Sequence, residues 1–315
     1  MEAKLIEKTY YYLWIVLLGF IAFSCEEEFV PEINNAPPEI VVEGYIEAGD
    51  NATSPYVILT RSIPFFNEIN LNNANDFYVR GADITVTNRD VVIELQEFCL
   101  NDLDPAQQVI AAEFFGIDLD SAMIDFCVYI DPTFSMVGVE GEQYDLNIEV
   151  EGKTITATTT LPEVPTIVEY AFFDTPGVPN DTLRELRMTL QDDPNEANFY
   201  RYFTNVNDAG ELAPITSVLN DLFFAGEIVE FPLPKAEPRG VEFNLETFGY
   251  YELGDTVEIK FCTIDEAHYD FWSTLEFNRA NQGPFSSYTA ISYNIEGGIG
   301  IWGGYSAYIT RLIVE

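Results

Sequence analysis

The chain has 315 residues, of which 47% are hydrophobic and 14% aromatic, so it can bury a sizeable core and global disorder is disfavoured. Lys and Arg total 14 against 53 Asp and Glu, which gives a formal net charge of −39. Such a charge repels the phosphates of nucleic acids and of anionic membranes, so no nucleic-acid partner is expected and any membrane association needs an anchor.

The first 24 residues have the features of a secretory signal peptide. Lys4 and Lys8 form a short charged region, and an apolar run from Tyr10 to Phe23 follows it. This run is shorter than the roughly 20 apolar residues that span a bilayer comfortably, and no basic stop signal comes after it. We therefore expect residues 1–24 to be a signal peptide rather than a transmembrane helix.

The residues from Ala22 to Cys25 resemble a bacterial lipobox, in which the cysteine receives a lipid when the signal peptide is removed. Cys25 is then the lipidation site, and its acyl chains anchor the protein in outer-membrane lipid. An ordinary signal peptide with an incidental cysteine is the alternative.

An acidic stretch, Glu26, Glu27 and Glu28, follows Cys25 directly. It resembles the surface-export signal of Bacteroidota lipoproteins, which predicts a lipid-anchored protein on the cell surface. A solvated tether on a protein of the periplasmic face of the outer membrane is the alternative. Residues 25–38 continue as an acidic, Pro-containing linker that is stiff and extended.

Short segments with a period of two dominate residues 39–164, and turn signals separate them. This pattern is typical of an antiparallel, immunoglobulin-like β-sandwich. Leu161, Pro162 and Pro165 break the pattern, so we place a domain boundary there. The expected strands are 40–46, 56–60, 82–87, 91–97, 144–150 and 154–160.

One segment of this first domain, at about 100–126, is predicted to be a short helical insertion between strands. Asp104 and Pro105 offer an N-cap and a first helical residue, and Gly116 can end the helix. Cys99 and Cys127 bracket the insertion, and an oxidising envelope permits a disulfide between them. The alternative is that all the cysteines other than Cys25 are buried free thiols.

Residues 165–315 are predicted to form a second β-rich domain with one helix near 264–280. Thr263 to Glu266 is a candidate capping box for this helix. His268 shares an apolar helical stripe with Phe271, Trp272 and Leu275, so we interpret it as a core histidine rather than a ligand. The expected strands are 186–190, 199–203, 257–261, 291–295 and 305–314. The predicted fold is thus mainly β, with two sandwich-like domains and few helices.

No catalytic residue or cofactor is predicted. The chain has one histidine and lacks the HExxH, GxSxG and paired zinc-type CxxC motifs. Asp102, Asp104, Asp118 and Asp120 are weak calcium candidates, but their spacing fits no standard loop, so no metal site is expected. A carboxylate-dependent glycan hydrolase needs none of these motifs and stays open as the alternative to a non-catalytic protein.

The glycines from Gly298 to Gly303 match the pattern G-x-G-x-x-G. A dinucleotide site needs these glycines at the start of a helix, and an alternating strand pattern follows them instead. We therefore expect a glycine-rich hairpin or close backbone packing around Trp302.

Short motifs recur in a fixed order along nearly the whole mature chain: Cys25 with its acidic tail, 40–46, 81–84, 141–146, 157–162, 192–194, 198–200, 269–272 and 294–305. This ordered set resembles the Bacteroidota lipoproteins of domain-of-unknown-function family 4249. The resemblance implies an accessory or binding lipoprotein beside a TonB-dependent outer-membrane receptor, and it implies no particular activity.

Overall fold

The computed structural model describes residues 37–50, 52–63, 77–117, 119, 125–176, 180–238, 244–281 and 289–315. The predicted signal peptide, Cys25 and Glu26–Glu28 lie outside these residues, as do Asp118 and Asp120. Residues 38–315 form one compact unit, which is the unit considered below. Strands dominate it and its described part has two α-helices, so the expected mainly β fold with few helices is confirmed.

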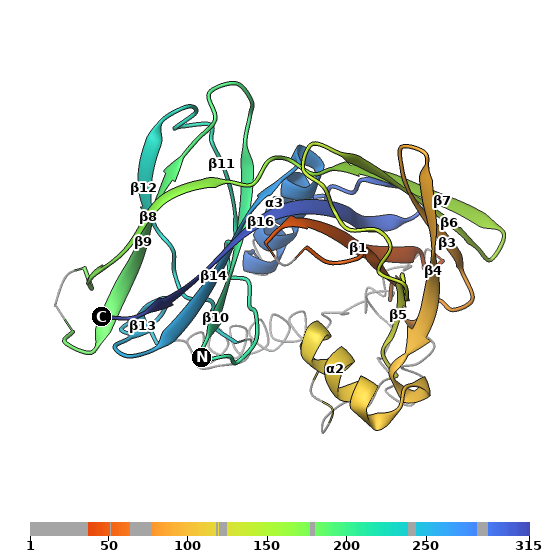
Figure 1. Ribbon diagram of the computed structural model, residues 1–315, viewed down its shortest axis with the longest axis horizontal. Helices are drawn as coiled ribbons and strands as arrows, with labels where there is room; N and C mark the ends of the chain where they lie inside the picture. The colour runs from red at the N-terminus through yellow and green to blue at the C-terminus, as the bar shows by residue number, and fades with distance from the viewer. Residues whose placement is uncertain are drawn as a thin grey trace, which may run out of the picture. The chain divides into compact units, whose positions relative to one another are not determined.

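Twelve strands form a sheet that draws on both halves of the sequence (Figure 1). In spatial order they are β11 (Val218–Asn220), β10 (Phe199–Val206), β14 (Thr256–Ile264), β16 (Ile299–Ile313), β1 (Ile40–Gly49), β2 (Tyr56–Arg61), β5 (Cys127–Ile130), β4 (Val91–Cys99), β3 (Asp83–Asn88), β6 (Gln143–Val150), β7 (Lys153–Thr160) and β15 (Ile295–Glu296).

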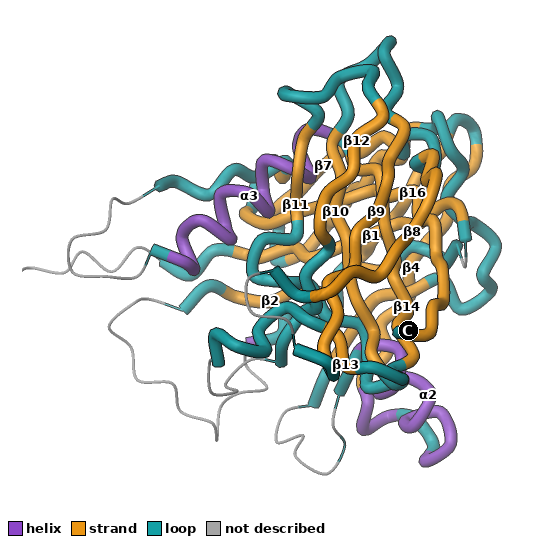
Figure 2. Tube along the Cα trace, turned by 90° about the vertical axis from the view of Figure 1, so that its left-hand side faces the viewer, coloured by secondary structure: helices purple, strands orange, loops and turns teal. Residues whose placement is uncertain are grey.

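A second sheet contains β8 (Thr166–Asp174), β9 (Leu183–Gln191), β12 (Ile228–Pro232) and β13 (Tyr251–Glu252). Its central strand, β9, pairs with all three others in antiparallel fashion. Figure 2 shows β8, β9 and β12 lying over β10 and β14 of the large sheet. Leu186, Met188 and Leu190 of β9 pack there against Tyr202 and Phe261, which forms one hydrophobic core.

The β6–β7 hairpin illustrates how the sequence specifies its strands. Alternate residues of β6, beginning with Tyr144, are buried, and the residues between them are more exposed. Glu151 and Gly152 join the two strands with positive φ angles of 53° and 74°. A two-residue turn of this kind matches the right-handed twist of the strands that it connects, so the predicted hairpin forms in register.

The first and last long strands of the unit, β1 and β16, pair in parallel from Val41–Ile299 to Gly49–Ala307. Gly300 makes this close approach feasible. Its φ is +120°, and a Cβ atom there would lie 1.9 Å from the carbonyl oxygen of Val42. The glycine-rich segment therefore serves close backbone packing, whereas a hairpin between β15 and β16 does not form.

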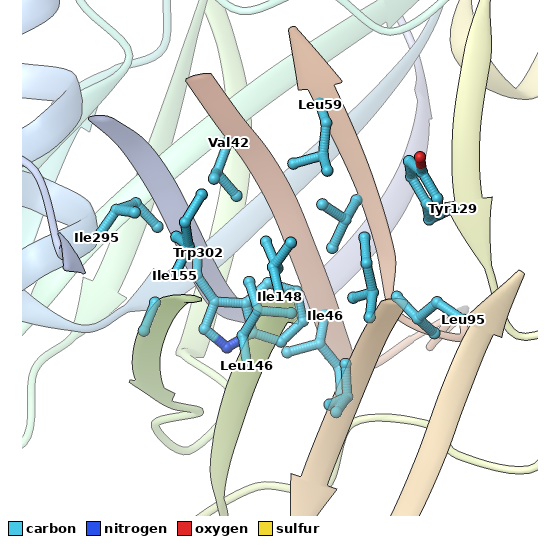
Figure 3. Packing of buried hydrophobic residues seen from close by; sticks show 14 of the residues in the cluster. Val42, Ile46, Leu59, Leu95, Tyr129, Leu146, Ile148, Ile155, Ile295 and Trp302 are labelled. Atoms are coloured by element: carbon cyan, nitrogen blue, oxygen red, sulfur yellow. The ribbon is translucent and has the colours of Figure 1, made fainter. Parts of the chain in front are cut away.

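A separate core fills the space between β1, β2 and the β3–β6–β7 strands (Figure 3). Trp302 of β16 lies at its centre, fully buried among Ile46, Leu146 and Ile155. The indole Nε1 of Trp302 donates to the carbonyl oxygen of Tyr144 at 3.0 Å, so its one polar atom is satisfied. β16 thus contributes to the core of the first half of the chain.

The two α-helices are α2 (Pro105–Phe115) and α3 (Glu266–Ala280). Both were predicted, but the capping of α3 was not. Asp265 is the N-cap residue, and its side chain accepts from the backbone N–H of His268 at 2.8 Å, so Thr263 ends β14 instead of capping the helix. The predicted strand 291–295 is also wrong in extent, because only Ile295 and Glu296 pair with β7.

The predicted boundary near Leu161–Pro165 falls between β7 and β8, where the chain leaves the large sheet for the second one. The large sheet takes strands from both sides of this point, and the division into two sandwich domains stays a prediction. Among the described residues, neither helix has the length and apolar character that crossing a membrane requires.

Candidate functional site

α3 covers part of the sheet face that lies opposite the Trp302 core. Residues of β16 alternate between the two faces, so Ile301 and Tyr305 point away from Trp302 and toward the helix. Phe271 and Trp272 of α3 pack against this face. A layer of aromatic and charged side chains therefore lies between the helix and the strands.

Asp265 fixes the start of α3 against the sheet. One carboxylate oxygen caps the helix, and the other accepts from Thr159 Oγ1 at 2.6 Å and from the Thr160 N–H at 3.1 Å, both on β7. Burial raises the pKa of Asp265, and these hydrogen bonds oppose that rise. The helix is consequently held in one position over the sheet.

His268 is fully buried beneath α3, as expected for a core histidine. Its Nδ1 lies 3.1 Å from the carbonyl oxygen of Gly304, and the ring packs so closely on Gly303 that a Cβ there would lie 2.8 Å from Nδ1. Burial lowers the pKa of His268 to about 3, so the ring is neutral at physiological pH. It has no access to a substrate proton.

A pocket of about 460 Å³ opens between the second half of α3 and the start of the β1–β16 pair. We call it the α3 pocket. Its volume lies in the range typical of small-molecule sites. The walls are mainly apolar, and Glu43 and Arg279 are the two charged residues among those that line it. The lining residues are Val41, Val42, Glu43, Phe271, Trp272, Leu275, Arg279, Ile291, Tyr293, Ile299, Gly300 and Ile301.

Glu43 is exposed to solvent in this pocket, although many protein atoms surround its carboxyl group. Burial raises the pKa of its carboxyl, against the lowering effect of the positive charges of Arg201 and Arg279. Glu43 pairs with Ile301 in the β1–β16 ladder, so its backbone is fixed. The carboxylate is thus a partly desolvated acceptor on a fixed backbone position of the pocket wall.

Arg201 of β10 supports the pocket wall from behind. Its guanidinium carbon lies 3.6 Å from the centre of the Trp272 ring and 4.6 Å from that of Phe203, a stacked cation–π arrangement. Its Nε donates to Ser217 Oγ at 3.3 Å, and Ser217 Oγ donates to Glu276 of α3 at 2.5 Å. This chain of contacts positions Trp272.

A second charged group lies on the same sheet face. Lys260 Nζ is 2.8 Å from a carboxylate oxygen of Glu47 and 3.7 Å from one of Glu211, and it lies 4.8 Å from the centre of the Tyr305 ring. A glycosidase uses two carboxylates, and Glu47 and Glu211 are two carboxylates near each other. Both carboxylates, however, contact the same ammonium group. The side chains of Glu47 and Lys260 are only 10% exposed, so this ion pair is not accessible to a substrate.

Cys262, a thiol outside the disulfide, is also shielded from solvent. Cys262 is a buried free thiol, and burial raises its pKa, so the reactive thiolate is not formed at neutral pH. Together with the neutral, enclosed His268, this leaves the α3 pocket with features suited to binding: one carboxylate, one guanidinium and aromatic walls.

The structure places Cys99 and Cys127 opposite each other on β4 and β5 and joins them by a disulfide. The calcium candidates are not brought together in the described part of the chain. Asp104 caps α2 by accepting from two backbone N–H groups, and Asp102 faces Arg80 at 3.7 Å. Among the described residues, the one metal-like grouping contains Glu97 with these two disulfide-bonded cysteines, which have no free thiolates.

The insertion between the two cysteines exposes apolar side chains. Val109, Ile110 and Phe114 of α2 are 56%, 68% and 54% exposed, and we call these three residues the α2 surface. The opposite side of α2 contacts the protein through Ala112 and Phe115, and Phe115 lies 5.3 Å from Tyr56 between ring centres. The helix is therefore apolar on both sides.

Sequence reasoning missed the α3 pocket. One signal was present, because Glu43 is a charge inside the apolar run from Ile40 to Ile46. Apart from its neighbours Val41 and Val42, the pocket residues come from segments more than 220 positions later, and periodicity does not say that these segments meet. Arg201 and Arg279 gave no signal that distinguished them from ordinary surface charges.

The fold and the site define a mainly β protein with a pocket between a helix and the face of its largest sheet. The chain belongs to the family described as "Domain of unknown function (DUF4249)", which it matches over residues 26–311. No curated protein sequence matches it.

Proposed function

We propose that this protein is a lipid-anchored, non-catalytic envelope protein that works at the bacterial cell surface beside a TonB-dependent outer-membrane receptor. The observation that carries the docking part of this proposal is the α2 surface. Burying a fully exposed aliphatic or aromatic side chain contributes about 1.5–3 kcal/mol, and these three side chains, which are 54–68% exposed, can each contribute part of that on docking.

The negative charge around α2 indicates which residues the partner should present. Residues 100–126, which contain α2, include six acidic residues and no basic residue. A partner loop should therefore present an apolar groove bordered by Lys or Arg, and salt should weaken the association. The acidic residues are Asp102, Asp104, Glu113, Asp118, Asp120 and Asp125.

Cross-linking in native membranes tests this role. The tagged full-length protein should recover an outer-membrane receptor, and Ile110→Ser with Phe114→Ser should reduce that recovery. Leu222→Ser with Phe223→Ser is a matched control, because these residues are also strongly exposed, at 72% and 94%, but lie in a loop away from α2 in the sequence. If the protein recovers no more receptor than an unrelated lipoprotein does, the accessory role is rejected. A freestanding binding protein or the carboxylate-dependent hydrolase would then be favoured.

Surface exposure is tested separately. Replacing Glu26, Glu27 and Glu28 by alanine should leave lipidation intact and retain the protein on the periplasmic face. Protease treatment of intact cells distinguishes the two faces. Equal cleavage of the wild type and the variant would remove the export role of the three glutamates, and no cleavage of the wild type would place the protein in the periplasm.

A further inference from the structure

The α3 pocket combines features that point to a ligand rather than to a packing defect. Its walls come from three separate segments, β1, β16 and α3, with Ile291 and Tyr293 closing one side. A Cβ atom at Gly300 would strike the Val42 carbonyl oxygen, so the backbones of β1 and β16 lie in close contact where they line the pocket. Ligand sites are usually largely pre-formed cavities lined by apolar side chains with a few polar groups.

Glu43 is the acceptor in this cavity. Among the described residues, no group forms a hydrogen bond or an ion pair directly with its carboxylate; Arg201 and Arg279 influence it through charge alone. A carboxylate in partly desolvated surroundings loses hydration, and that loss is offset when a charged donor binds it. An ammonium group that enters the pocket can provide this contact.

Arg279 supplies the opposite charge. It lies in the last turn of α3 and lines the same pocket as Glu43. A guanidinium has five N–H donors, so it can bind a ligand carboxylate while it keeps other partners. A purely cationic ligand would meet repulsion from Arg279, and a purely anionic one would meet repulsion from Glu43.

The rest of the lining is apolar or aromatic. Phe271 and Trp272 stand at 89° to each other with ring centres 5.3 Å apart, which gives an edge-to-face corner, and Leu275 and Ile291 add aliphatic wall. Such a surface favours a ligand with an aliphatic or aromatic side chain.

We infer that the α3 pocket binds a small zwitterion with a large apolar side chain, that is, an apolar or aromatic amino acid or a short peptide of such residues. The ligand amino group contacts Glu43, its carboxylate contacts Arg279, and its side chain lies against Phe271, Trp272 and Leu275. This inference does not depend on receptor docking, which uses the α2 surface.

Calorimetric titration of the full-length protein in detergent tests the inference with five probes. L-phenylalanine and L-phenylalanyl-L-leucine carry both charges, phenethylamine carries only the amine, and 3-phenylpropionate carries only the carboxylate. L-alanine keeps both charges and lacks the large side chain. At least one of the first two should bind more tightly than each of the other three. Failure of both to bind, or equal binding of phenethylamine or 3-phenylpropionate, overturns the inference.

Variants assign the contacts. Glu43→Gln should weaken zwitterion binding by about 10- to 100-fold and leave 3-phenylpropionate unweakened, because only the amine contact is lost. Arg279→Gln should weaken the zwitterion and leave phenethylamine unweakened. Glu39→Gln, an exposed glutamate on the same stretch of chain, is the control and should change nothing.

If Glu43→Gln fails to fold, Leu275→Trp provides an independent check. A larger side chain at this half-buried helix position fills the pocket and should abolish binding while the circular-dichroism spectrum and melting temperature stay close to those of the wild type. Unchanged binding in a folded Leu275→Trp variant would show that the ligand lies elsewhere and would overturn the assignment.

Discussion

Glu47 of β1 and Lys260 of β14 form a 2.8 Å ion pair although 213 positions separate them in the chain. β16 lies between their two strands, so the pair crosses over it, beside the ring of Tyr305. Because both side chains are largely buried, each charge depends on the other for its solvation.

The two partners of this pair should not be equivalent on mutation. Lys260→Met leaves Glu47 and Glu211 close together without a cation and should destabilise the fold by about 3–5 kcal/mol. Glu47→Gln leaves Lys260 near Glu211 and should cost less. Urea unfolding of the two single variants and the double variant measures the difference. A larger loss for Glu47→Gln would contradict this account.

Asp131 should stabilise the folded protein at neutral pH and lose this effect in acid. Its carboxylate accepts hydrogen bonds from the backbone and the side chain of both Thr133 and Ser135. Burial raises its pKa, but these four bonds outweigh that effect and lower the pKa to about 2. Since the folded pKa lies below the unfolded one of about 3.9, this stability is present above pH 4 and lost as the pH falls toward 2.

Urea midpoints between pH 6 and pH 2.5 check this expectation. The wild type should lose more stability over this interval than Asp131→Asn, which lacks the titrating carboxylate. Asp90→Asn, at an exposed turn, serves as the control and should follow the wild type. Parallel curves for the wild type and Asp131→Asn would contradict the assignment.

Gly300→Ala should be among the most damaging small substitutions. The added methyl group meets the Val42 backbone at 1.9 Å and the φ of +120° disfavours alanine, so we expect a loss of roughly 3 kcal/mol or more. Gly81→Ala separates the two effects, because Gly81 has a φ of +68° and open space around it, and should cost about 1 kcal/mol. Thermal unfolding that ranks the two variants equally would exclude the steric explanation.

Removal of the Cys99–Cys127 disulfide should destabilise the protein by about 3–4 kcal/mol in the chain-entropy model, given the sequence separation of 28 between the cysteines. The measurement is urea unfolding of the Cys99→Ser, Cys127→Ser double variant. Peptide mapping without reductant should find these two cysteines joined and Cys262 free. Two free thiols at positions 99 and 127 in the native protein would refute the bond.

Cys25→Ser should abolish lipidation, because the predicted acyl acceptor is lost. The variant should keep its signal peptide at this site or be released from the membrane fraction. Intact-mass measurement and detergent partitioning distinguish the two forms from the lipidated wild type. A variant that still carries a diacylglyceryl mass would disprove the assignment of Cys25.

Local patterns predicted part of the local structure, but not the strands β5, β8, β11, β12 and β13. The alternation on both sides of Glu151–Gly152 specified the β6–β7 hairpin, and the apolar stripe around Trp272 specified α3. The N-cap was misplaced because Thr263 and Asp265 both suit a helix start, and β14 continues through Ile264. Pairings between distant segments, such as Val41 with Ile299, leave no periodic signal, and the α3 pocket depends on them.

The parallel pairing of β1 with β16 also sets the order of folding. β16 lies between β1 and β14 and carries Trp302 into the core of the first half. A chain that emerges N-terminus first therefore holds β1 without its neighbour until residues 299–313 arrive, and a nascent chain truncated before them leaves the Trp302 core unfilled. Contacts this distant in sequence slow folding. The first half of the protein therefore completes its core only when the last strand of the chain has been made.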